Sequence, residues 1–299
     1  MKKIKIHLLT LPRWFAIPFF AASTFMGILL AGGNLTTCYP YLGLLAGLLL
    51  MAGGHSFNTL LDYSWTGLDK GKVEDRSAEK SYTGGQSVIA RGLITPGEVL
   101  ANACGWYILA LIPIIYLANN IGPMIYPIAF MGMAVTFWYS WAKFNYTHEL
   151  ALGAGVGPIA VLLGMFSVSG SPDWLTGLII SGPFAVILSF AGLALDEFPD
   201  AEANLKKGVR SIAYKVWEYK VDLGSYLNVW IIAMYVYQVF LITVDILCPL
   251  TGITFVLVPV FLGLSVMLKG NFEKAAPIYV VVGALYPVLL VLGQALGGE

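Results

Sequence analysis

The 299-residue chain is 58% hydrophobic and only 11% charged, with a mean hydropathy of +0.77. This composition excludes a soluble globular domain, in which about 25% of residues are charged, and it indicates an integral membrane protein. The 17 Lys and Arg residues balance the 17 Asp and Glu residues, which argues against nucleic acid as a partner.

Nine membrane-spanning helices are predicted, since a spanning helix needs about 20 mostly apolar residues. The apolar run after the basic residues 1–5 is interrupted by Pro12, Arg13 and Pro18 and lacks a small-residue cleavage pattern, so we interpret it as leading into a retained first helix. No polar linker divides the chain, so we expect one membrane domain over residues 1–299. The predicted helices cover residues 15–32, 41–61, 97–118, 122–142, 150–170, 174–196, 224–244, 248–268 and 276–296.

Positive charge is confined to the N-terminus and to alternate connections between these helices. Lys and Arg occur between predicted helices two and three, four and five, six and seven, and eight and nine, and the other connections contain none. The positive-inside rule therefore predicts a multi-pass protein of the cell membrane with a cytoplasmic N-terminus and an outer C-terminus. Cys38, Cys104 and Cys248 lack metal-type spacing and are interpreted as apolar residues. Whether Cys38 and Cys248 pair is left open.

Two clusters of acidic and amide side chains end predicted helices two and six. Asn58 and Asp62 are four residues apart and share one helix face, and Asp69 follows them. Asp196 and Asp200 form the second cluster, where Pro199 is expected to break or kink the helix. The predicted topology puts both clusters on the cytoplasmic side, where Asp62 and Asp196 directly adjoin apolar sequence. The four-helix interval suggests two related four-helix units plus a ninth helix, which we treat as a hypothesis.

These residues suit a divalent cation that is shared with a phosphate group. Mg²⁺ prefers oxygen ligands and is usually held by one or two carboxylates together with substrate phosphates. We predict that Mg²⁺ at the two clusters neutralises a diphosphate leaving group as a carbon–oxygen bond breaks. Solvated charges at helix ends are the plainer interpretation, but a charge inside an apolar span is costly and tends to mark function. The predicted metal ligands are Asn58, Asp62, Asp69, Asp196 and Asp200, with Asp62 and Asp196 also assigned to catalysis.

Basic and aromatic residues near these clusters complete the predicted site. Tyr139 and Lys143 are four residues apart at the end of predicted helix four. They fit an interfacial belt with a snorkelling lysine, or a ring that flanks a carbocation or the acceptor beside a phosphate-binding lysine. His55 is expected to be packed or hydrogen-bonded rather than a ligand. The predicted diphosphate contacts are Lys80, Lys143, Lys207 and Arg210.

Two long polar connections, about residues 62–96 and 197–223, follow the clusters. Loops of this length are usually functional or disordered. We expect them to form a partly helical cytoplasmic cap over the opening of a cavity.

The two clusters resemble those of the UbiA superfamily of intramembrane prenyltransferases. Asn58, Asp62 and Asp69 match its first motif, N-x-x-x-D followed by another Asp, and Asp196 and Asp200 match its second, D-x-x-x-D. Residues 85–96 and 200–211 look like segments of the menaquinone branch, the dihydroxynaphthoate prenyltransferases. Three features depart from that branch: the interval from Asp62 to Asp69 is one residue longer, Asn204 stands where Asp is common, and Ser211 stands where Thr is common.

The resemblance implies a lateral cavity within the bilayer. It further implies Mg²⁺-dependent transfer of an isoprenyl chain from a prenyl diphosphate to a lipophilic, aromatic, quinone-precursor acceptor. The sequence does not decide among a naphthoate, a hydroxybenzoate, a porphyrin side chain and a glycerol lipid, and it leaves open the tail length and the oligomeric state. An ion-coupled transporter is the alternative, although it would favour charges near the bilayer midplane. A CDP-alcohol type transferase would carry a D-G-x-x-A-R signature, which this chain lacks.

Overall fold

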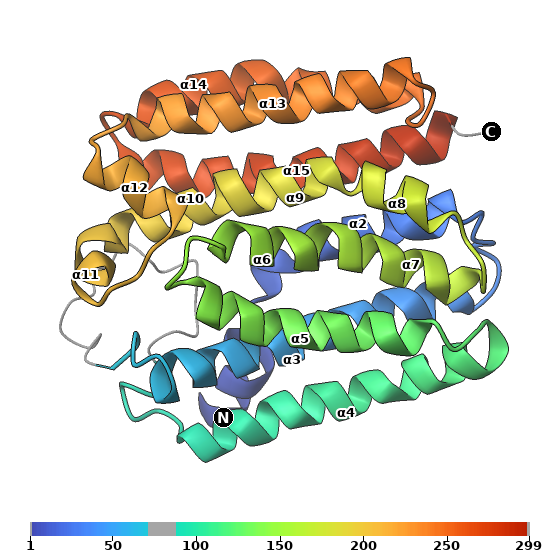
Figure 1. Cartoon of the computed structure of the whole chain (residues 1–299), viewed down its shortest axis with the longest axis horizontal. Helices are drawn as coiled ribbons and strands as arrows, with labels where there is room; N and C mark the ends of the chain where they lie inside the picture. The colour runs from blue at the N-terminus through green and yellow to red at the C-terminus, as the bar shows by residue number, and fades with distance from the viewer. Residues whose placement is uncertain (1, 71–87, 298–299) are drawn as a thin grey trace.

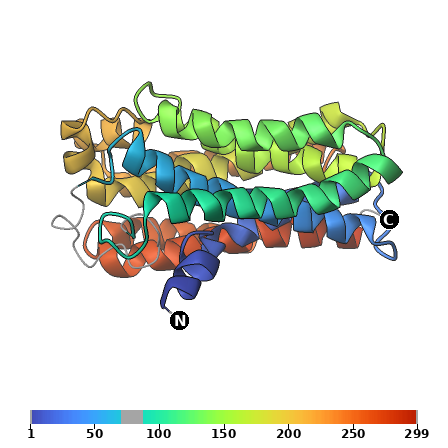
Figure 2. The ribbon, with the colours of Figure 1, turned by 90° about the horizontal axis from the view of Figure 1, so that it is seen from below.

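The computed structural model describes residues 2–70 and 88–297, and the elements in these ranges are helical. The long helices run side by side in one elongated bundle, and the short helix α1 protrudes from its side (Figures 1 and 2). Within the described residues, eight segments are long and apolar enough to cross a membrane. They are Lys3–Leu30, Tyr39–Ser64, Pro96–Asn120, His148–Val168, Trp174–Lys206, Leu223–Thr243, Pro249–Leu268 and Phe272–Gly297.

The first half of the chain forms mostly continuous helices. The N-terminal segment consists of α1 (Lys2–Lys5), the π-helical η1 (Ile6–Thr10) and the 3₁₀-helical η2 (Trp14–Ala16). The long helices that follow are α2 (Ile17–Leu30), α3 (Tyr39–Ser64), α4 (Pro96–Asn120) and α5 (Ile125–Ala142). Helix α4 begins at a capping box formed by Thr95 and Glu98.

The predicted helix over residues 122–142 is present as α5 but is not among the eight apolar segments. Its last turn contains Trp138, Tyr139, Ser140 and Trp141, which are less apolar than aliphatic residues. The prediction of nine spanning helices is therefore confirmed for eight segments.

In the second half, three predicted spans consist of several helical pieces. The predicted fifth span contains α6 (His148–Ala154), the π-helical η4 (Gly155–Ile159) and α7 (Ala160–Val168). The sixth contains α8 (Trp174–Ile180), α9 (Gly182–Val186), the π-helical η5 (Ile187–Gly192) and α10 (Leu193–Glu197). The eighth contains the 3₁₀-helical η7 (Pro249–Leu257) and α14 (Val258–Leu268). Pro158, Pro183 and Pro249 lie in these pieces, and proline removes a backbone donor and disturbs regular α-helix.

The remaining elements are α13 (Leu223–Thr243), α15 (Phe272–Gly297) and three short helices between α10 and α13. These short helices are the 3₁₀-helical η6 (Phe198–Asp200), α11 (Ala201–Lys206) and α12 (Ile212–Glu218). They lie at the left-hand end of the bundle in Figure 1, whereas the C-terminus lies at the right-hand end. Residues 197–223 are thus partly helical, as predicted. Residues 71–87 of the predicted cap lie outside the described part of the chain, so the cap as a whole stays a prediction.

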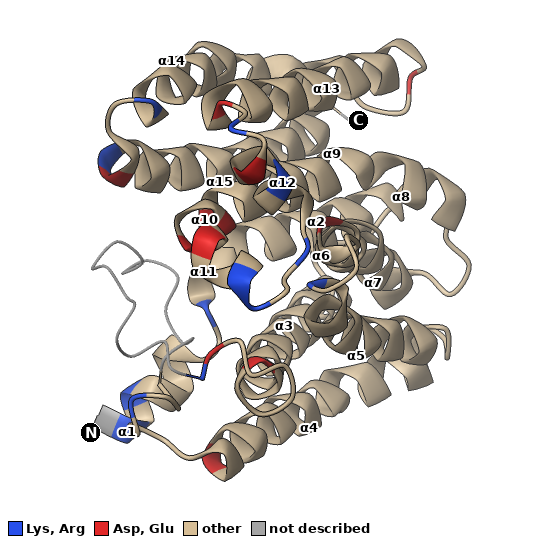
Figure 3. Cartoon of the chain, turned by 60° about the vertical axis from the view of Figure 1, so that its left-hand side comes forward, with Lys and Arg blue, Asp and Glu red and all other residues tan. Residues whose placement is uncertain are grey.

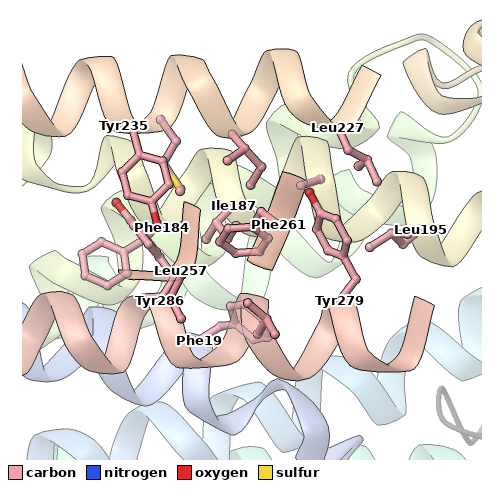
Figure 4. Packing of buried hydrophobic residues seen from close by; sticks show 14 of the residues in the cluster. Phe19, Phe184, Ile187, Leu195, Leu227, Tyr235, Leu257, Phe261, Tyr279 and Tyr286 are labelled. Atoms are coloured by element: carbon pink, nitrogen blue, oxygen red, sulfur yellow. The ribbon is translucent and has the colours of Figure 1, made fainter. Parts of the chain in front are cut away.

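The largest hydrophobic cluster lies where α13, α14 and α15 pack on α2 and η5. Phe261, Tyr279 and Tyr286 are fully buried there (Figure 4). The hydroxyl of Tyr286 donates to Gln238 Oε1 at 3.0 Å, and Gln238 Nε2 donates to the Thr251 carbonyl at 2.9 Å. Buried polar groups need such partners where no water can reach them.

Helices α2 and α7 contact each other closely at two glycines, one on each helix. A Cβ atom on Gly27 would collide with the Val161 carbonyl oxygen, and one on Gly164 would collide with the Thr24 carbonyl oxygen. Small residues at such crossings let two helix backbones approach closely within a membrane. This crossing positions α2 beside the elements that form the candidate site.

Candidate functional site

Asp62 and Lys143 form a buried ion pair between the end of α3 and the residue after α5. Asp62 is 4% exposed, and Lys143 Nζ donates to its Oδ2 atom at 2.6 Å. The second carboxylate oxygen, Oδ1, is buried and accepts no hydrogen bond from the described residues. Lys143, the predicted phosphate contact, lies against the predicted metal ligand Asp62, and its role toward phosphate stays a prediction.

Asn58 and Asp69 lie close to this pair. Asn58 Nδ2 donates to Ser140 Oγ at 2.9 Å, which fixes the amide group against α5. The Asp69 backbone N–H donates to the Asp62 carbonyl oxygen at 3.1 Å, and the Asp69 side chain is buried. Gly67, at a φ of +69°, allows the chain to turn back between the two aspartates. The interval from Asp62 to Asp69, one residue longer than in the menaquinone branch, therefore contains a turn, and Asp69 still lies beside Asp62.

The second acidic cluster lies where α10 ends. Asp196 is on α10, and Asp200 ends the 3₁₀ turn η6, which contains Pro199. The expected interruption at the proline is thus present, as a change from α-helical to 3₁₀-helical backbone. Both side chains are half-buried.

The connections after α3 and α10 meet beside these clusters. Lys207 Nζ donates to the Leu68 carbonyl at 2.9 Å, and Leu68 packs with Ala201, Val209 and Tyr214 in a small buried cluster. Most charged residues gather at this end of the bundle, around α1, α10, α11 and α12 (Figure 3). The fold thus brings together two segments that are about 140 residues apart in sequence.

The donor atoms fit Mg²⁺ if a phosphate completes its shell. Among the described residues no three His, Cys, Asp or Glu side chains are grouped closely enough to hold a metal by themselves. Mg²⁺ does not need such a group, because one or two carboxylates, waters and substrate phosphate oxygens usually surround it. The buried Oδ1 atom of Asp62, which no described donor satisfies, is the kind of hard oxygen that this cation prefers.

Tyr139 lies between the two clusters. Its ring is 5.0 Å from Lys143 Nζ and 4.3 Å, centroid to centroid, from the His148 ring. Its side chain lines one cavity together with Asn58 and another together with Asp196. His148 Nδ1 lies 3.9 Å from Glu197 Oε1, so a short chain of contacts connects the Tyr139 ring to α10.

The other predicted diphosphate contacts differ in their positions. Lys207 is exposed and bonds to the backbone between α3 and residue 70, as described above. The Arg210 side chain is exposed, while its backbone N–H donates to the Lys143 carbonyl at 2.6 Å. Lys80 lies outside the described residues. Of the three predicted residues that lie in the described part of the chain, Lys143 alone is placed directly at Asp62.

Arg13, which the sequence-based predictions count only among the N-terminal charges, lies inside the site. It is 8% exposed, and its Nε and Nη2 atoms are buried without a hydrogen-bond partner among the described residues. Its backbone is left-handed, with a φ of +53°. A buried cation is costly unless an anion compensates it. The available signal was a lone arginine between Pro12 and Trp14 in apolar sequence, because such charges tend to be functional.

Two pockets meet at Arg13, His55 and Tyr139. The inner pocket lies between α3, α5 and the segment α6–η4–α7, and Asn58 lines it. The lateral pocket lies between α2, the segment η5–α10 and α15, and Asp196 lines it. The walls of both pockets are mainly apolar. A ligand can therefore place a charged group at the shared mouth and an attached apolar chain within the bundle.

Cys38, Cys104 and Cys248 are free thiols, so the possible Cys38–Cys248 pair is not formed.

Solved structures of similar fold cover nearly the whole chain. A structure described as that of a digeranylgeranylglyceryl phosphate synthase in membranes is 15% identical, with a TM-score of 0.62 and 99% of both chains covered. The apo UbiA homologue from Aeropyrum pernix K1 is 14% identical, with a TM-score of 0.66, 94% of this chain and 97% of the other covered. A UbiA homologue from Archaeoglobus fulgidus bound to DMAPP and Mg²⁺ is 15% identical, with a TM-score of 0.53 and coverages of 94% and 98%.

At these identities the structural matches establish the fold. A search of curated proteins finds no match. The sequence model of the UbiA prenyltransferase family matches residues 20–280, which contain both acidic clusters and most of the walls of the two pockets. This multi-pass membrane protein therefore belongs to the UbiA prenyltransferase family and is a transferase.

Proposed function

We propose that the protein transfers an isoprenyl chain from a prenyl diphosphate to a lipophilic aromatic acceptor of the quinone-precursor type, in a reaction that depends on Mg²⁺. The observation that carries this proposal is the buried Arg13, whose Nε and Nη2 atoms have no hydrogen-bond partner among the described residues, at the shared mouth of two apolar pockets that Asn58 and Asp196 also line. A diphosphate attached to an apolar chain supplies the anion that Arg13 requires and the apolar body that the pockets require.

Each charged residue has a distinct role in this proposal. Asn58, Asp62 and Asp69 on one side, and Asp196 and Asp200 on the other, hold Mg²⁺ with the diphosphate. Arg13 binds diphosphate oxygens directly, because charge-assisted bonds to phosphate are strong. Lys143 holds the Asp62 carboxylate in place through its hydrogen bond and adds positive charge beside the diphosphate. Lys80, Lys207 and Arg210 contribute further positive charge toward the diphosphate. Bound Mg²⁺ supplies charge neutralisation for the leaving diphosphate.

The reaction balances with residues of this chain and the two substrates. The carbon–oxygen bond of the prenyl diphosphate breaks, and the diphosphate keeps the electron pair. The allylic carbon then accepts an electron pair from the acceptor and forms the new carbon–carbon bond, and the proton that the acceptor loses passes to the released diphosphate. The Tyr139 ring lies between the clusters, where its face is suited to stabilise positive charge on the allylic carbon.

The topology is part of the same proposal. The end of the bundle that carries α11 and α12 faces the cytoplasm, and residues 1–299 act as one membrane domain with the connections 62–96 and 197–223 as its cap. The likeness of residues 85–96 and 200–211 to the menaquinone branch supports a quinone-type acceptor. Family membership does not favour the ion-coupled transporter.

The purified protein in lipid nanodiscs tests this function. With Mg²⁺, dimethylallyl or geranyl diphosphate and a panel of hydroxylated aromatic acceptors, we expect a prenylated product by mass spectrometry. Asp62→Ala and Asp196→Ala should each reduce turnover at least about a thousand-fold, because an uncompensated leaving-group charge raises the barrier by several kcal/mol. Asp173→Ala, which removes an exposed cap of α8, is the matched control and should retain activity. Full turnover by either site variant would contradict the metal assignment.

A further inference from the structure

The chain before α2 is held along one stripe of α4. We call residues 2–14 the N-terminal arm. Its first helix, α1, protrudes from the side of the bundle (Figure 2). Glu98, Asn102 and Trp106 are spaced four residues apart and therefore form one stripe along α4. This stripe contacts the arm at residues 3, 7 and 14, in chain order.

Asn102 is the central contact of the stripe. Its Nδ2 atom donates to the His7 carbonyl oxygen at 3.2 Å. Its Oδ1 atom accepts from Ser56 Oγ of α3 at 2.8 Å and from Trp106 Nε1 at 3.1 Å. One half-buried amide group thus joins the arm to two helices of the bundle.

The other two contacts differ in strength. Lys3 Nζ lies 2.6 Å from Glu98 Oε1, but these side chains are 63% and 32% exposed, and exposed ion pairs contribute little to stability. Trp14 packs edge-on against Trp106, with ring centroids 6.0 Å apart, and Trp14 Nε1 donates to the Leu8 carbonyl oxygen at 2.6 Å. The arm is therefore held mainly by the central amide and by the pair of tryptophans.

These contacts fix the chain on both sides of Arg13. Leu11 is fully buried in a cluster with Ile94 and Val99, and Trp14 follows Arg13 directly. Arg13 has a left-handed backbone, with φ +53° and ψ +58°, which a residue with a side chain keeps only where its surroundings fix it. A long cationic side chain at the end of an apolar segment otherwise turns toward water. The contacts before and after Arg13 therefore hold its guanidinium group inside the protein.

We infer that Asn102 and Trp106 are positioning residues, which hold the N-terminal arm on α4 and thereby keep the Arg13 guanidinium at the shared mouth of the two pockets. The inference rests on the proposed function, in which Arg13 binds the diphosphate of the donor. Neither Asn102 nor Trp106 is among the described residues that line the two pockets, so neither is placed to touch the donor. Their effect on donor binding therefore acts through the arm and through Arg13.

A double-mutant cycle tests this dependence. The affinity for unreactive dimethylallyl S-thiolodiphosphate is measured with Mg²⁺ by calorimetry in lipid nanodiscs. Asn102→Leu should weaken binding about ten-fold, because a displaced Arg13 makes weaker charge-assisted bonds to the diphosphate. In the Arg13→Leu background the same change should alter the affinity by less than about two-fold, since the two residues act as one unit. Asn120→Leu makes the same chemical change at the exposed far end of α4 and should be neutral in both backgrounds.

The possible outcomes separate the inference from the proposed function. An unchanged affinity in Asn102→Leu would overturn the inference. So would an equal loss in both backgrounds, because Asn102 would then act independently of Arg13. Wild-type protein that does not bind the analogue, or Arg13→Leu protein that binds it as tightly as the wild type, would instead contradict the proposed function and the role of Arg13 in it.

Trp106→Phe is a milder second variant, which keeps an aromatic ring against Trp14 and loses the hydrogen bond to Asn102. It should weaken binding of the analogue about three-fold, with the same dependence on Arg13. In turnover, both variants should raise the KM for dimethylallyl diphosphate and leave the KM for a hydroxylated aromatic acceptor unchanged. Asn102→Gln, which keeps the amide donor and acceptor, should recover most of the loss. An equal rise in the acceptor KM would show a general disturbance of the fold and would contradict a positioning role.

Discussion

At the scale of single residues, the site is defined by buried charges with incomplete compensation. Lys143 satisfies one oxygen of Asp62, whereas Arg13 and the other Asp62 oxygen have no described hydrogen-bond partner. Desolvated charges are tolerated where a ligand of opposite charge completes them. These incompletely compensated charges therefore lower the stability of the unliganded protein, and the proposed substrate and cation would compensate them.

Arg13→Leu separates function from stability. The variant should bind prenyl diphosphate about ten- to a hundred-fold more weakly, because a hydrogen bond to a charged group contributes about 1.5–3 kcal/mol. Its thermal midpoint in detergent should equal or exceed that of the wild type, since the change removes a buried charge that has no hydrogen-bond partner among the described residues. Arg13→Lys, which keeps the charge without the forked guanidinium, should lie between the two in affinity. A loss of stability without loss of affinity would assign Arg13 to the fold instead.

Lys143→Met should be destabilising because it leaves the Asp62 carboxylate buried without its cation. Breaking a buried pair in this way costs about 3–5 kcal/mol. The double variant Lys143→Met/Asp62→Asn removes both charges and should recover most of the thermal stability but no transferase activity. Thermal unfolding followed by tryptophan fluorescence, together with the turnover assay, distinguishes these outcomes. Equal stability of Lys143→Met and the wild type would show that the pair is unimportant in the resting protein.

At the scale of elements, close helix crossings and irregular helices shape the pockets. The π-helical η4 lines the inner pocket, whereas the π-helical η5 lines the lateral pocket and, through Leu188, the inner pocket as well. A π-helical turn is wider than an α-helical turn and is frequent at functional sites. The α2–α7 crossing places Phe20 of α2 in the wall of the inner pocket and Phe19 in that of the lateral pocket.

Gly27→Ala should disrupt that crossing. The added Cβ would meet the backbone of Val161, which cannot move away by changing a side-chain rotamer. We expect a loss of about 1–3 kcal/mol, the usual range for overpacking. Gly263→Ala makes the same chemical change on an exposed helix face and should be neutral or slightly stabilising, because alanine is the better helix former. The thermal midpoints of the two variants are measured in detergent. Similar midpoints would contradict the close contact between α2 and α7 at Gly27.

At the scale of the whole molecule, one end of the bundle carries most of the charge and both acidic clusters (Figure 3). The opposite end carries the α2–α3 connection, with Cys38 exposed. This asymmetry predicts that Cys38 faces the outside of the cell and that α12 faces the cytoplasm.

Thiol labelling of intact cells tests this orientation. With Cys104 and Cys248 changed to Ser, Cys38 should react with a membrane-impermeant maleimide added outside. A variant with a single cysteine at the exposed end of α12, Glu218→Cys with all three native cysteines removed, should react only after the cells are opened. The reverse pattern would place the candidate site on the outer side.

The sequence by itself determined the helical membrane class, the positions of most spans and the residues of both acidic clusters. Composition and charge placement carry this information because the bilayer imposes a minimum apolar length and penalises charge within it. Asn58, Asp62 and Asp69 could be grouped from local spacing, since four residues complete about one helical turn.

Only the tertiary structure decided which distant groups meet. The pairing of Lys143 with Asp62, the burial of Arg13 between two pockets and the exposure of Arg210 depend on how helices from different parts of the chain pack. Local spacing does not encode these contacts. The changes from α-helix to π-helix after residues 154 and 186 also depend on the tertiary structure. Neighbouring helices, together with the prolines in these spans, determine where a widened turn is tolerated. Side-chain partners across a bundle are chosen by packing, which a one-dimensional pattern does not specify.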